Sequence, residues 1–249
     1  MKIMAITQAR YGSSRFLGKV LKPLGTSTVL DLHLRRIKKT RLINAFAVAT
    51  TQEPESNEIS LIAKDNGFDV FKGSLHDVLD RYYQAARIQN PDFVVRVTSD
   101  CPLIDPNYLD ELVEKFLAGE YDYGSNCLRP TLPDGMDAEI FSFSALEEAW
   151  LLAKKNSERE HVTPFIRESS KFRKFSLEYP LDRSSYRLTL DTQEDYQVIK
   201  KLVENCGAEA KMEDYVHYLD THPDLKSINH HFQRNEGYKI SLENDEVDE

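Results

Sequence analysis

The sequence has few cysteines, no long apolar segment and no excess of positive charge, and each absence excludes a class of protein. Its three cysteines, Cys101, Cys127 and Cys206, form no Cys-x-x-Cys pair and no disulfide framework, which favours a reducing compartment. No run reaches about 18 apolar residues, and the N-terminus carries no signal-peptide pattern, so we expect a cytoplasmic protein that does not enter a membrane. The formal net charge of −9 argues against nucleic acid or a membrane surface as a partner.

The chain also lacks internal repeats and linkers rich in proline or glycine, and its first half alternates between two hydrophobic periods. Short apolar runs predict strands at residues 2–7, 45–50, 69–71 and 93–98. Apolar residues at helical spacing predict a helix after each strand, and the fourth helix begins with Asp105 as N-cap and Pro106 in its first turn. Four such units predict an α/β fold with a mostly parallel central sheet and helices on both faces.

The second half is less regular. Its patterns predict strands at residues 139–143, 172–178 and 186–189, a helix at 144–154 with Ser144 as N-cap, and a helix capped by Thr192. From Leu242 the tail is acidic, and we expect it to be frayed or disordered. We therefore expect a single domain over residues 1–225 and a C-terminal extension over residues 226–249.

The segment after the first expected strand concentrates groups that can hold a polyphosphate. Within ten residues it contains three cations, two glycines and two serines: Arg10, Arg15, Lys19, Gly12, Gly18, Ser13 and Ser14. Glycines allow a close approach of the backbone, and the cations and hydroxyls can bind phosphate oxygens. The segment is neither a Walker A loop nor a GxGxxG fingerprint. A solvated basic turn is the alternative interpretation.

Two aspartates follow expected strands of the sheet. Asp100 closes the strand at 93–98, and Asp191 closes the one at 186–189. Ligands of parallel sheets bind outside the carboxyl ends of the strands, and Mg²⁺ prefers one or two carboxylates together with phosphate oxygens and waters. The alternatives are a turn-forming role for Asp100 and helix capping by Asp191, although Thr192 already supplies that cap.

Four blocks of the chain, in this order, carry a family resemblance. They are QARYGSSRFLGKVL at residues 8–21, VTSDCPL at 97–103, EHVTP at 160–164 and RLTLDT at 187–192. Together they resemble the cytidylyltransferases that make CMP-activated sugar acids, namely CMP-Kdo synthetases, acylneuraminate cytidylyltransferases and above all the SpsF group of spore-coat polysaccharide proteins. The resemblance covers about residues 1–205. Where relatives carry Arg-Leu-Pro-Gly-Lys, this chain has Phe16 and Leu17 before Gly18, so the stiffening proline is missing.

The resemblance implies a Rossmann-like nucleotide-diphospho-sugar transferase fold, CTP as donor and Mg²⁺ as cofactor. By position, it implies that Arg10 and Lys19 bind the triphosphate and that Asp100 and Asp191 bind the metal. These four are the expected catalytic residues. The other residues expected at the nucleotide are Ala9, Gly12, Ser13, Ser14 and Arg81. For Arg81 the alternative is an exposed helical arginine paired with Asp77.

The acceptor side is less clearly marked. Asp137 and Glu139 lie in a carboxylate-rich loop where an acceptor loop would fall, although a solvated turn fits as well. His161 could reach the acceptor or a subunit interface, but a histidine beside apolar residues is more often structural. The histidines after residue 216 lack the spacing of a zinc site.

The resulting hypothesis is transfer of CMP from CTP to a nonulosonic or ulosonic sugar acid, with release of pyrophosphate, in surface polysaccharide or glycan biosynthesis. A glycosyltransferase on the same fold is the alternative, but such enzymes usually carry Asp-x-Asp at the end of a central strand, and this chain has none. A non-catalytic nucleotide-binding module would not need both Asp100 and Asp191. The expected partners are CTP and a sugar acid, without nucleic acid or membrane; the identity of the sugar acid, and monomer or homodimer, stay open.

Overall fold

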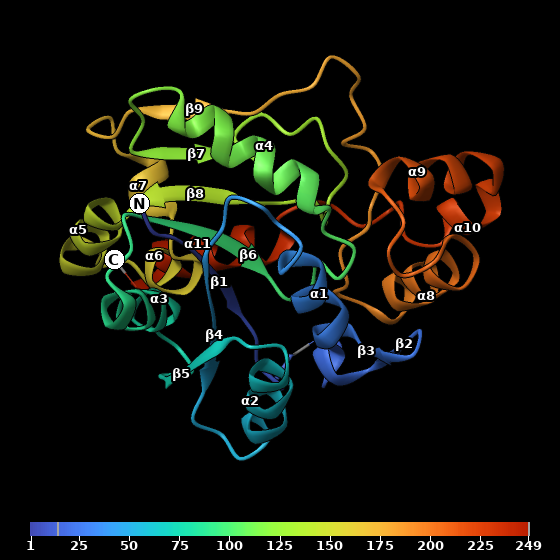
Figure 1. Ribbon diagram of the computed structural model, residues 1–249, viewed down its shortest axis with the longest axis horizontal. Helices are drawn as coiled ribbons and strands as arrows, with labels where there is room; N and C mark the ends of the chain where they lie inside the picture. The colour runs from blue at the N-terminus through green and yellow to red at the C-terminus, as the bar shows by residue number, and fades with distance from the viewer. Residues whose placement is uncertain (14, 249) are drawn as a thin grey trace.

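A seven-stranded, mostly parallel sheet forms the centre of the computed structural model, which describes residues 1–13 and 15–248 (Figure 1). Its strands, in spatial order, are β5 (Asp69–Gly73), β4 (Ala45–Thr51), β1 (Ile3–Gln8), β6 (Phe93–Thr98), β8 (Glu139–Ser142), β7 (Tyr123–Ser125) and β9 (Lys174–Ser176). Within this sheet, β8 runs antiparallel to both of its neighbours, whereas the remaining ladders are parallel. The predicted α/β fold with a Rossmann-like sheet is confirmed.

Helices cover both faces of the sheet. Successive residues of a strand point to opposite faces, so apolar strands expose apolar side chains on both sides, and each side needs a cover. In β1, Ile3 and Ala5 belong to one core, and Met4 and Ile6 belong to the other. The first core is closed by α1 (Val29–Ile37), α2 (Ser56–Asp65) and α4 (Pro106–Leu117). The second core is closed by α3 (Val78–Gln89), α5 (Phe143–Leu152) and α7 (Pro164–Glu168), and α6 (Asn156–His161) packs against α3. Asp105 and Pro106 begin α4 as predicted.

A third core lies beside the sheet, at one end of the molecule (Figure 1). It is built by α8 (Gln193–Cys206), α9 (Met212–Thr221), α10 (Pro223–Ser227), the hairpin of β2 (Pro23–Leu24) and β3 (Ser27–Thr28), and nearby loops. The 3-10 helix η1 (Lys19–Leu21) leads into this hairpin. Leu188 and Leu190 are buried in the same core, so the segment that carries Asp191 packs against α8 and not into the sheet.

Two local predictions from the sequence are wrong. Residues 186–189 do not form a strand; they make one isolated bridge, between Arg187 and Asp134, because they run beside the loop of Asp134 outside the sheet. The helix predicted from Ser144 begins earlier, since the side chain of Ser142 accepts the N–H of Ala145 and caps α5. Within α5, Ser144 is therefore a helical residue.

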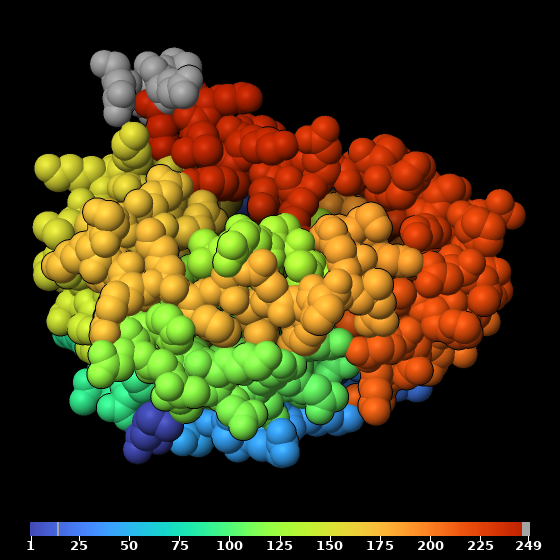
Figure 2. Space-filling model, turned by 90° about the horizontal axis from the view of Figure 1, so that it is seen from above, coloured from blue at the N-terminus to red at the C-terminus, as the bar shows by residue number. Residues whose placement is uncertain are grey.

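The C-terminal segment also differs from its prediction. The tail expected to fray from Leu242 is helical up to Asp248, as part of α11 (Glu236–Asp248). One reason is that the buried carboxylate of Asp245 accepts the N–H of Ser157 at the start of α6 over 3.0 Å. Figure 2 shows the segment, in red, crossing the molecule from the end with α9 and α10 toward the yellow residues of the other end. In the described part of the chain, no helix is long and apolar enough to cross a membrane.

Candidate active site

The predicted phosphate loop follows β1 directly. Ala9 is buried, and its N–H donates to the carbonyl of Ala49 on β4, which fixes the start of the loop. Gly18 has a φ of 65°, and a Cβ there would lie 2.9 Å from the ring of Tyr11, so this position requires glycine. A Cβ on Gly12 would meet nothing within 4 Å, so the space beside this residue is open.

The remaining residues of the loop differ in their contacts. The hydroxyl of Ser13 accepts the N–H of Phe16 over 3.4 Å. Arg10 is exposed and makes no hydrogen bond or ion pair to any residue that the structure describes. Ser14, predicted to line the same loop, lies outside the described residues. The loop therefore presents one uncommitted guanidinium, at Arg10, beside the end of the central strand.

Lys19 brings the carboxylates of Asp100 and Asp191 together. Its ammonium lies 3.1 Å from Oδ2 of Asp100 and 2.8 Å from Oδ1 of Asp191. Arg15 adds a second cation, 3.0 Å from Oδ2 of Asp191. Asp100 and Asp191, which lie far apart in the sequence, thus share one positive charge.

The electrostatics of this cluster favour the charged forms. Burial alone would lower the pKa of Lys19, but the carboxylates of Asp100 and Asp191 outweigh burial and raise this pKa above its usual 10.5. Burial likewise opposes ionisation of Asp100, yet Lys19 and a hydrogen bond from Thr98 hold the pKa of Asp100 well below its usual range. The site therefore favours the charged forms of Lys19 and of Asp100, which lie 3.1 Å apart.

The hydrogen bonds that fix the backbone at Asp100 and Asp191 do not use the carboxylates of these two residues. The carbonyl of Asp100 accepts the N–H of Leu190 over 2.7 Å, which ties the two aspartate-bearing segments together. At the start of α8, the N–H groups of Asp191 and Thr192 are bound by the side chain of Asp195. The side chain of Thr192 in turn caps the helix, as predicted from the sequence. The carboxylate of Asp191 is therefore not needed as a cap.

A second charged cluster adjoins the first. Arg187 contacts Asp134 and Asp195 at 2.8 Å each, and its remaining nitrogen lies 3.5 Å from Asp191. Arg234, from the segment before α11, binds the predicted acceptor residue Asp137 and lies 3.8 Å from Asp134.

Burial raises the pKa of Asp134 to about 7, and the neighbouring charge of Asp137 acts in the same direction. Burial also raises the pKa of Asp137. The charge of Asp191 helps to raise the pKa of Asp134, and the charge of Asp100 helps to raise the pKa of Asp137. The pair of Asp134 and Asp137 therefore lies within electrostatic reach of the first cluster.

Two other predicted acceptor residues have partners inside the protein. The carboxylate of Glu139, on β8, accepts hydrogen bonds from Arg96 at 2.5 Å, Tyr123 at 2.5 Å and Thr163 at 2.6 Å. His161 lies against α11, where its Nε2 is 3.0 Å from the hydroxyl of Ser241. Glu139 therefore anchors the sheet to α7, and His161 helps to hold the C-terminal helix.

Arg81 is buried, with 2% of its surface exposed, so its interpretation as an exposed helical arginine is wrong. Its guanidinium donates to the carbonyls of Ser74 and Leu75, and Asp77 is paired with Arg159 instead. Arg10 contributes to lowering the pKa of Arg81, after burial, so the two cations lie within electrostatic reach of each other.

Sequence reasoning missed several residues of these clusters. Arg187 stands in one of the four blocks and Asp134 in the carboxylate-rich loop, so a signal was present for both. Arg234 lies in a segment without any recognisable pattern. Only the path of the chain after α10 brings it to Asp137.

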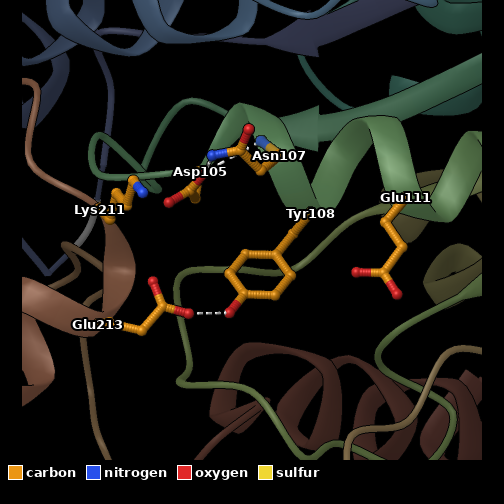
Figure 3. Close-up of a pocket in the computed structure, with 6 residues that line it drawn as sticks. All are labelled: Asp105, Asn107, Tyr108, Glu111, Lys211 and Glu213. Atoms are coloured by element: carbon orange, nitrogen blue, oxygen red, sulfur yellow. Dashed lines mark hydrogen bonds between the residues drawn. The ribbon is translucent and has the colours of Figure 1, made fainter.

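A separate hollow of about 400 Å³ lies between the N-terminus of α4 and α9. Its lining residues are Asp105, Asn107, Tyr108, Glu111, Lys211 and Glu213 (Figure 3). The hydroxyl of Tyr108 donates to Glu213 across it, and Asp105 caps α4 and also accepts the N–H of Met212. The hollow contains none of the predicted site residues, and its side chains serve the contact between the two helices.

The mostly parallel sheet flanked by helices is the Rossmann-like fold of nucleotidyltransferases. The profile of the cytidylyltransferase family matches residues 4–221, and the chain belongs to this family. The resemblance read from the four blocks is thereby confirmed.

Three relatives match the chain along most of their length. An uncharacterized protein of Methanocaldococcus jannaschii is 40% identical over 233 residues, which are 92% of this chain and 95% of the relative. The spore coat polysaccharide biosynthesis protein SpsF of Bacillus subtilis is 31% identical over 234 residues, 89% of this chain and 95% of SpsF. The structure of a cytidylyltransferase from Leptospira borgpetersenii is 38% identical, with a TM-score of 0.86 over 91% of this chain and 97% of the other.

Two more distant structures share the fold alone. CMP:2-keto-3-deoxy-manno-octonic acid synthetase, complexed with CTP, is 14% identical with a TM-score of 0.63 and covers 82% of this chain and 99% of that chain. Rv0371C of Mycobacterium tuberculosis, in complex with manganese, is also 14% identical, with a TM-score of 0.57 over 81% of this chain and 99% of that chain.

Proposed function

We propose that this protein transfers CMP from CTP to a sugar acid, with release of pyrophosphate, and that the transfer depends on Mg²⁺. The observation that carries the proposal is the single ammonium of Lys19 shared by Asp100 and Asp191. This contact joins the loop that we expect to bind phosphate to two carboxylates, and nucleotidyl transfer requires both at one place. Membership of the cytidylyltransferase family and the similarity to SpsF support CTP as the donor and a sugar as the acceptor.

The two carboxylates fit a hard divalent cation. Mg²⁺ takes one or two carboxylates and completes its coordination with phosphate oxygens and waters. Among the described residues no group of three or more His, Cys, Asp or Glu side chains could hold a metal, so this site suits a cation that arrives with a nucleotide. Lys19 already occupies a position between Asp100 and Asp191 that attracts positive charge. The manganese complex of the distant neighbour supports the same interpretation.

When bound, the metal would supply positive charge to the phosphates of CTP. Lys19 and Arg15, released from the aspartates, would turn to the phosphate oxygens, and Arg10 is unengaged with the described residues and can join them. A hydroxyl of the acceptor would then attack the α-phosphorus and give up its proton to water, and the bond from this phosphorus to the bridging oxygen of pyrophosphate would break. These cations stabilise the charge that develops on the leaving pyrophosphate, and positioning supplies most of the remaining catalysis.

On the acceptor side, we propose Asp137 and Arg234 as the binding groups. A carboxylate can accept hydrogen bonds from sugar hydroxyls, and a guanidinium can bind the carboxylate of a sugar acid. Nε of Arg234 has no hydrogen-bond partner in the described structure, and its distance of 3.8 Å to Asp134 is too long for a hydrogen bond, so it can donate to a ligand. We leave Glu139 and His161 out of the acceptor site because their polar atoms already bind Arg96, Tyr123, Thr163 and Ser241.

We also propose a role for Arg81 and a place for the reaction. Arg81 would act beside the nucleotide through its effect on Arg10, because its own guanidinium is held by main-chain carbonyls. The three cysteines are free thiols, so we place the reaction in the cytoplasm, in the biosynthesis of surface polysaccharide or glycan. Residues 1–225 would form the cytidylyltransferase domain, and residues 226–249 an extension that lies across it.

Two measurements test this function. Thermal shifts with CTP, UTP, ATP and GTP, each with Mg²⁺, should show the largest stabilisation for CTP. Pyrophosphate release from CTP should then require a sugar acid, tested with a panel of ulosonic and nonulosonic acids. A preference for UTP would contradict the proposal and favour a glycosyltransferase.

A further inference from the structure

A buried histidine that the proposed mechanism does not use contacts the residue that follows Asp100. His33, on α1, is fully buried, with 0% of its surface exposed. Its Nε2 lies 2.8 Å from the hydroxyl of Thr7 on β1, and its Nδ1 lies 2.9 Å from the carbonyl oxygen of Cys101. The side chain thus connects a helix, the central strand and the turn that follows β6.

The partners determine which nitrogen of His33 carries the proton. A carbonyl oxygen can only accept a hydrogen bond, so Nδ1 must be the donor to Cys101. Burial lowers the pKa of His33 to about 4, so the ring is neutral near pH 7 and Nε2 is an acceptor. The hydroxyl of Thr7 then donates to Nε2 of the His33 ring, and the ring donates to the carbonyl of Cys101. The ring cannot rotate by 180° without losing both hydrogen bonds.

This arrangement holds the turn of Asp100 from two sides. The carbonyl of Asp100 accepts the N–H of Leu190 over 2.7 Å, and the next carbonyl, that of Cys101, accepts Nδ1–H of His33. Two consecutive peptide carbonyls are thus fixed, one to the segment that carries Asp191 and one to α1. Fixing both carbonyls limits the rotation of the backbone that would swing the side chain of Asp100 away from Lys19.

We propose that His33 is a positioning residue for the metal site: through the carbonyl of Cys101 it holds the carboxylate of Asp100 where Asp191 can share a divalent cation with it. The inference rests on the proposed function, in which these aspartates bind Mg²⁺ together with CTP. It assigns to α1, a helix that carries none of the predicted site residues, an influence on the nucleotide site through the carbonyl of Cys101. Residues that orient metal ligands typically change metal affinity by about 10- to 100-fold when they are replaced.

Two substitutions of His33 test its two hydrogen bonds one at a time, because each substitution removes a different bond. The side-chain amide nitrogen of asparagine can lie where Nδ1 lies, so His33→Asn can keep the contact to Cys101 and lose the one to Thr7. The amide nitrogen of glutamine reaches the place of Nε2, so His33→Gln keeps the contact near Thr7 and loses the one to Cys101. Both variants lose the aromatic ring, and a merely structural role would make them equally damaging. Thr7→Val is the matched control, because it removes only the hydrogen bond between the Thr7 hydroxyl and Nε2 of His33.

The readout is CTP binding by titration calorimetry, with and without Mg²⁺, which needs no acceptor. We expect Mg²⁺ to strengthen CTP binding equally, within about threefold, in the wild type, His33→Asn and Thr7→Val. In His33→Gln this gain should fall by about 10- to 100-fold. Equal losses in the two histidine variants, or no loss in either, would overturn the role of His33. A wild type whose CTP affinity ignores Mg²⁺ would instead contradict the proposed function.

A second measurement does not depend on the variants folding. Nitrogen-15 chemical shifts of the His33 ring in the wild-type protein report which nitrogen is protonated. We expect a protonated Nδ1 and an unprotonated Nε2 at pH 7. The opposite tautomer would mean that His33 does not donate to Cys101, and it would overturn the proposal even if both variants were unstable.

Discussion

The N–H of Leu190 donates to the carbonyl of Asp100 over 2.7 Å, and this hydrogen bond, beside a longer one from the hydroxyl of Thr189, joins the two segments that supply the paired carboxylates. Asp191 follows Leu190 directly in the chain, so the bond sets the distance between the carboxylates before any ligand arrives. Because both ends of the bond are main-chain atoms, substitutions of either aspartate should leave the geometry of the other intact. The first prediction follows from this property.

Asp191→Asn should nearly abolish turnover and cost little stability. The start of α8 is capped by Thr192 and Asp195, so the Asp191 carboxylate is not needed for folding. Turnover is measured as pyrophosphate release and stability as the midpoint of thermal unfolding. Glu194→Gln, in the same helical turn, is the control and should change neither. A large loss of stability in Asp191→Asn would show that this carboxylate has a structural task.

Lys19→Met should have opposite effects on the metal and on the nucleotide. Without the ammonium, Asp100 and Asp191 repel each other, so the free protein loses stability but binds Mg²⁺ alone more tightly than the wild type. CTP binding should weaken by about 100-fold, since a charge-assisted phosphate contact is lost. Thermal shifts with Mg²⁺ alone and with Mg²⁺ and CTP measure the two effects. Lys22→Met is the matched control, and a variant with unchanged affinity for Mg²⁺ would contradict the shared site.

Arg10→Ala should weaken the binding of CTP more than that of CMP. Arg10 is exposed and makes no hydrogen bond or ion pair to the described residues, so its removal should not disturb the fold. If its guanidinium binds the β- or γ-phosphate, only the triphosphate loses a contact. Titration calorimetry with both nucleotides checks this. Equal losses for CMP and CTP would place Arg10 at the base, the ribose or the α-phosphate instead.

Arg234→Gln should raise the KM for the sugar acid by about 10- to 100-fold, the usual effect of losing a hydrogen bond to a charged group. The KM for CTP should stay within about twofold. Steady-state kinetics with the acceptor found by the pyrophosphate assay give both values. Arg183→Gln is the control, because Arg183 is half-buried but pairs with Glu213 on α9, away from the site. A rise in the KM for CTP alone would move Arg234 to the nucleotide side.

The pH dependence of stability should reveal His33. Its pKa is about 4 in the folded protein and 6.5 ordinarily, mainly because of burial, with the carboxylate of Asp100 and the guanidinium of Arg36 as the nearby charges that also act on it. The folded protein therefore binds fewer protons between these values, and stability that is complete above pH 6.5 is lost as the pH falls toward 4. This loss amounts to at most about 3 kcal/mol.

Urea unfolding of the wild type and of His33→Gln across this range measures the effect. The free energies of unfolding of the two proteins should converge as the pH falls, because the variant has no group to protonate at this position. Asp134 has a raised pKa of about 7 and works in the opposite direction, but it does so in both proteins. Parallel curves would show that His33 is not held neutral by the fold.

The sequence by itself determined the layers of the fold and the first half of the site. Alternating and helical periods in residues 2–117 depend on local geometry, so they placed β1, β4, β5, β6 and the helices between them. Asp100 follows β6 almost directly, and Lys19 ends the loop that leaves β1, so the rule for parallel sheets was enough to expect both near the carboxyl ends of these strands.

The tertiary structure alone decided how the charges are shared. Asp191 was expected at the end of a strand, yet it follows a segment that packs on α8 and reaches Asp100 through Leu190. Arg234 comes to Asp137 from a part of the chain without any pattern, and His33 looks like any polar residue on an amphipathic helix. Contacts between distant segments depend on the packing of whole elements, which leaves no periodic trace in the sequence. Periodicity therefore predicted the elements, and packing decided which side chains meet.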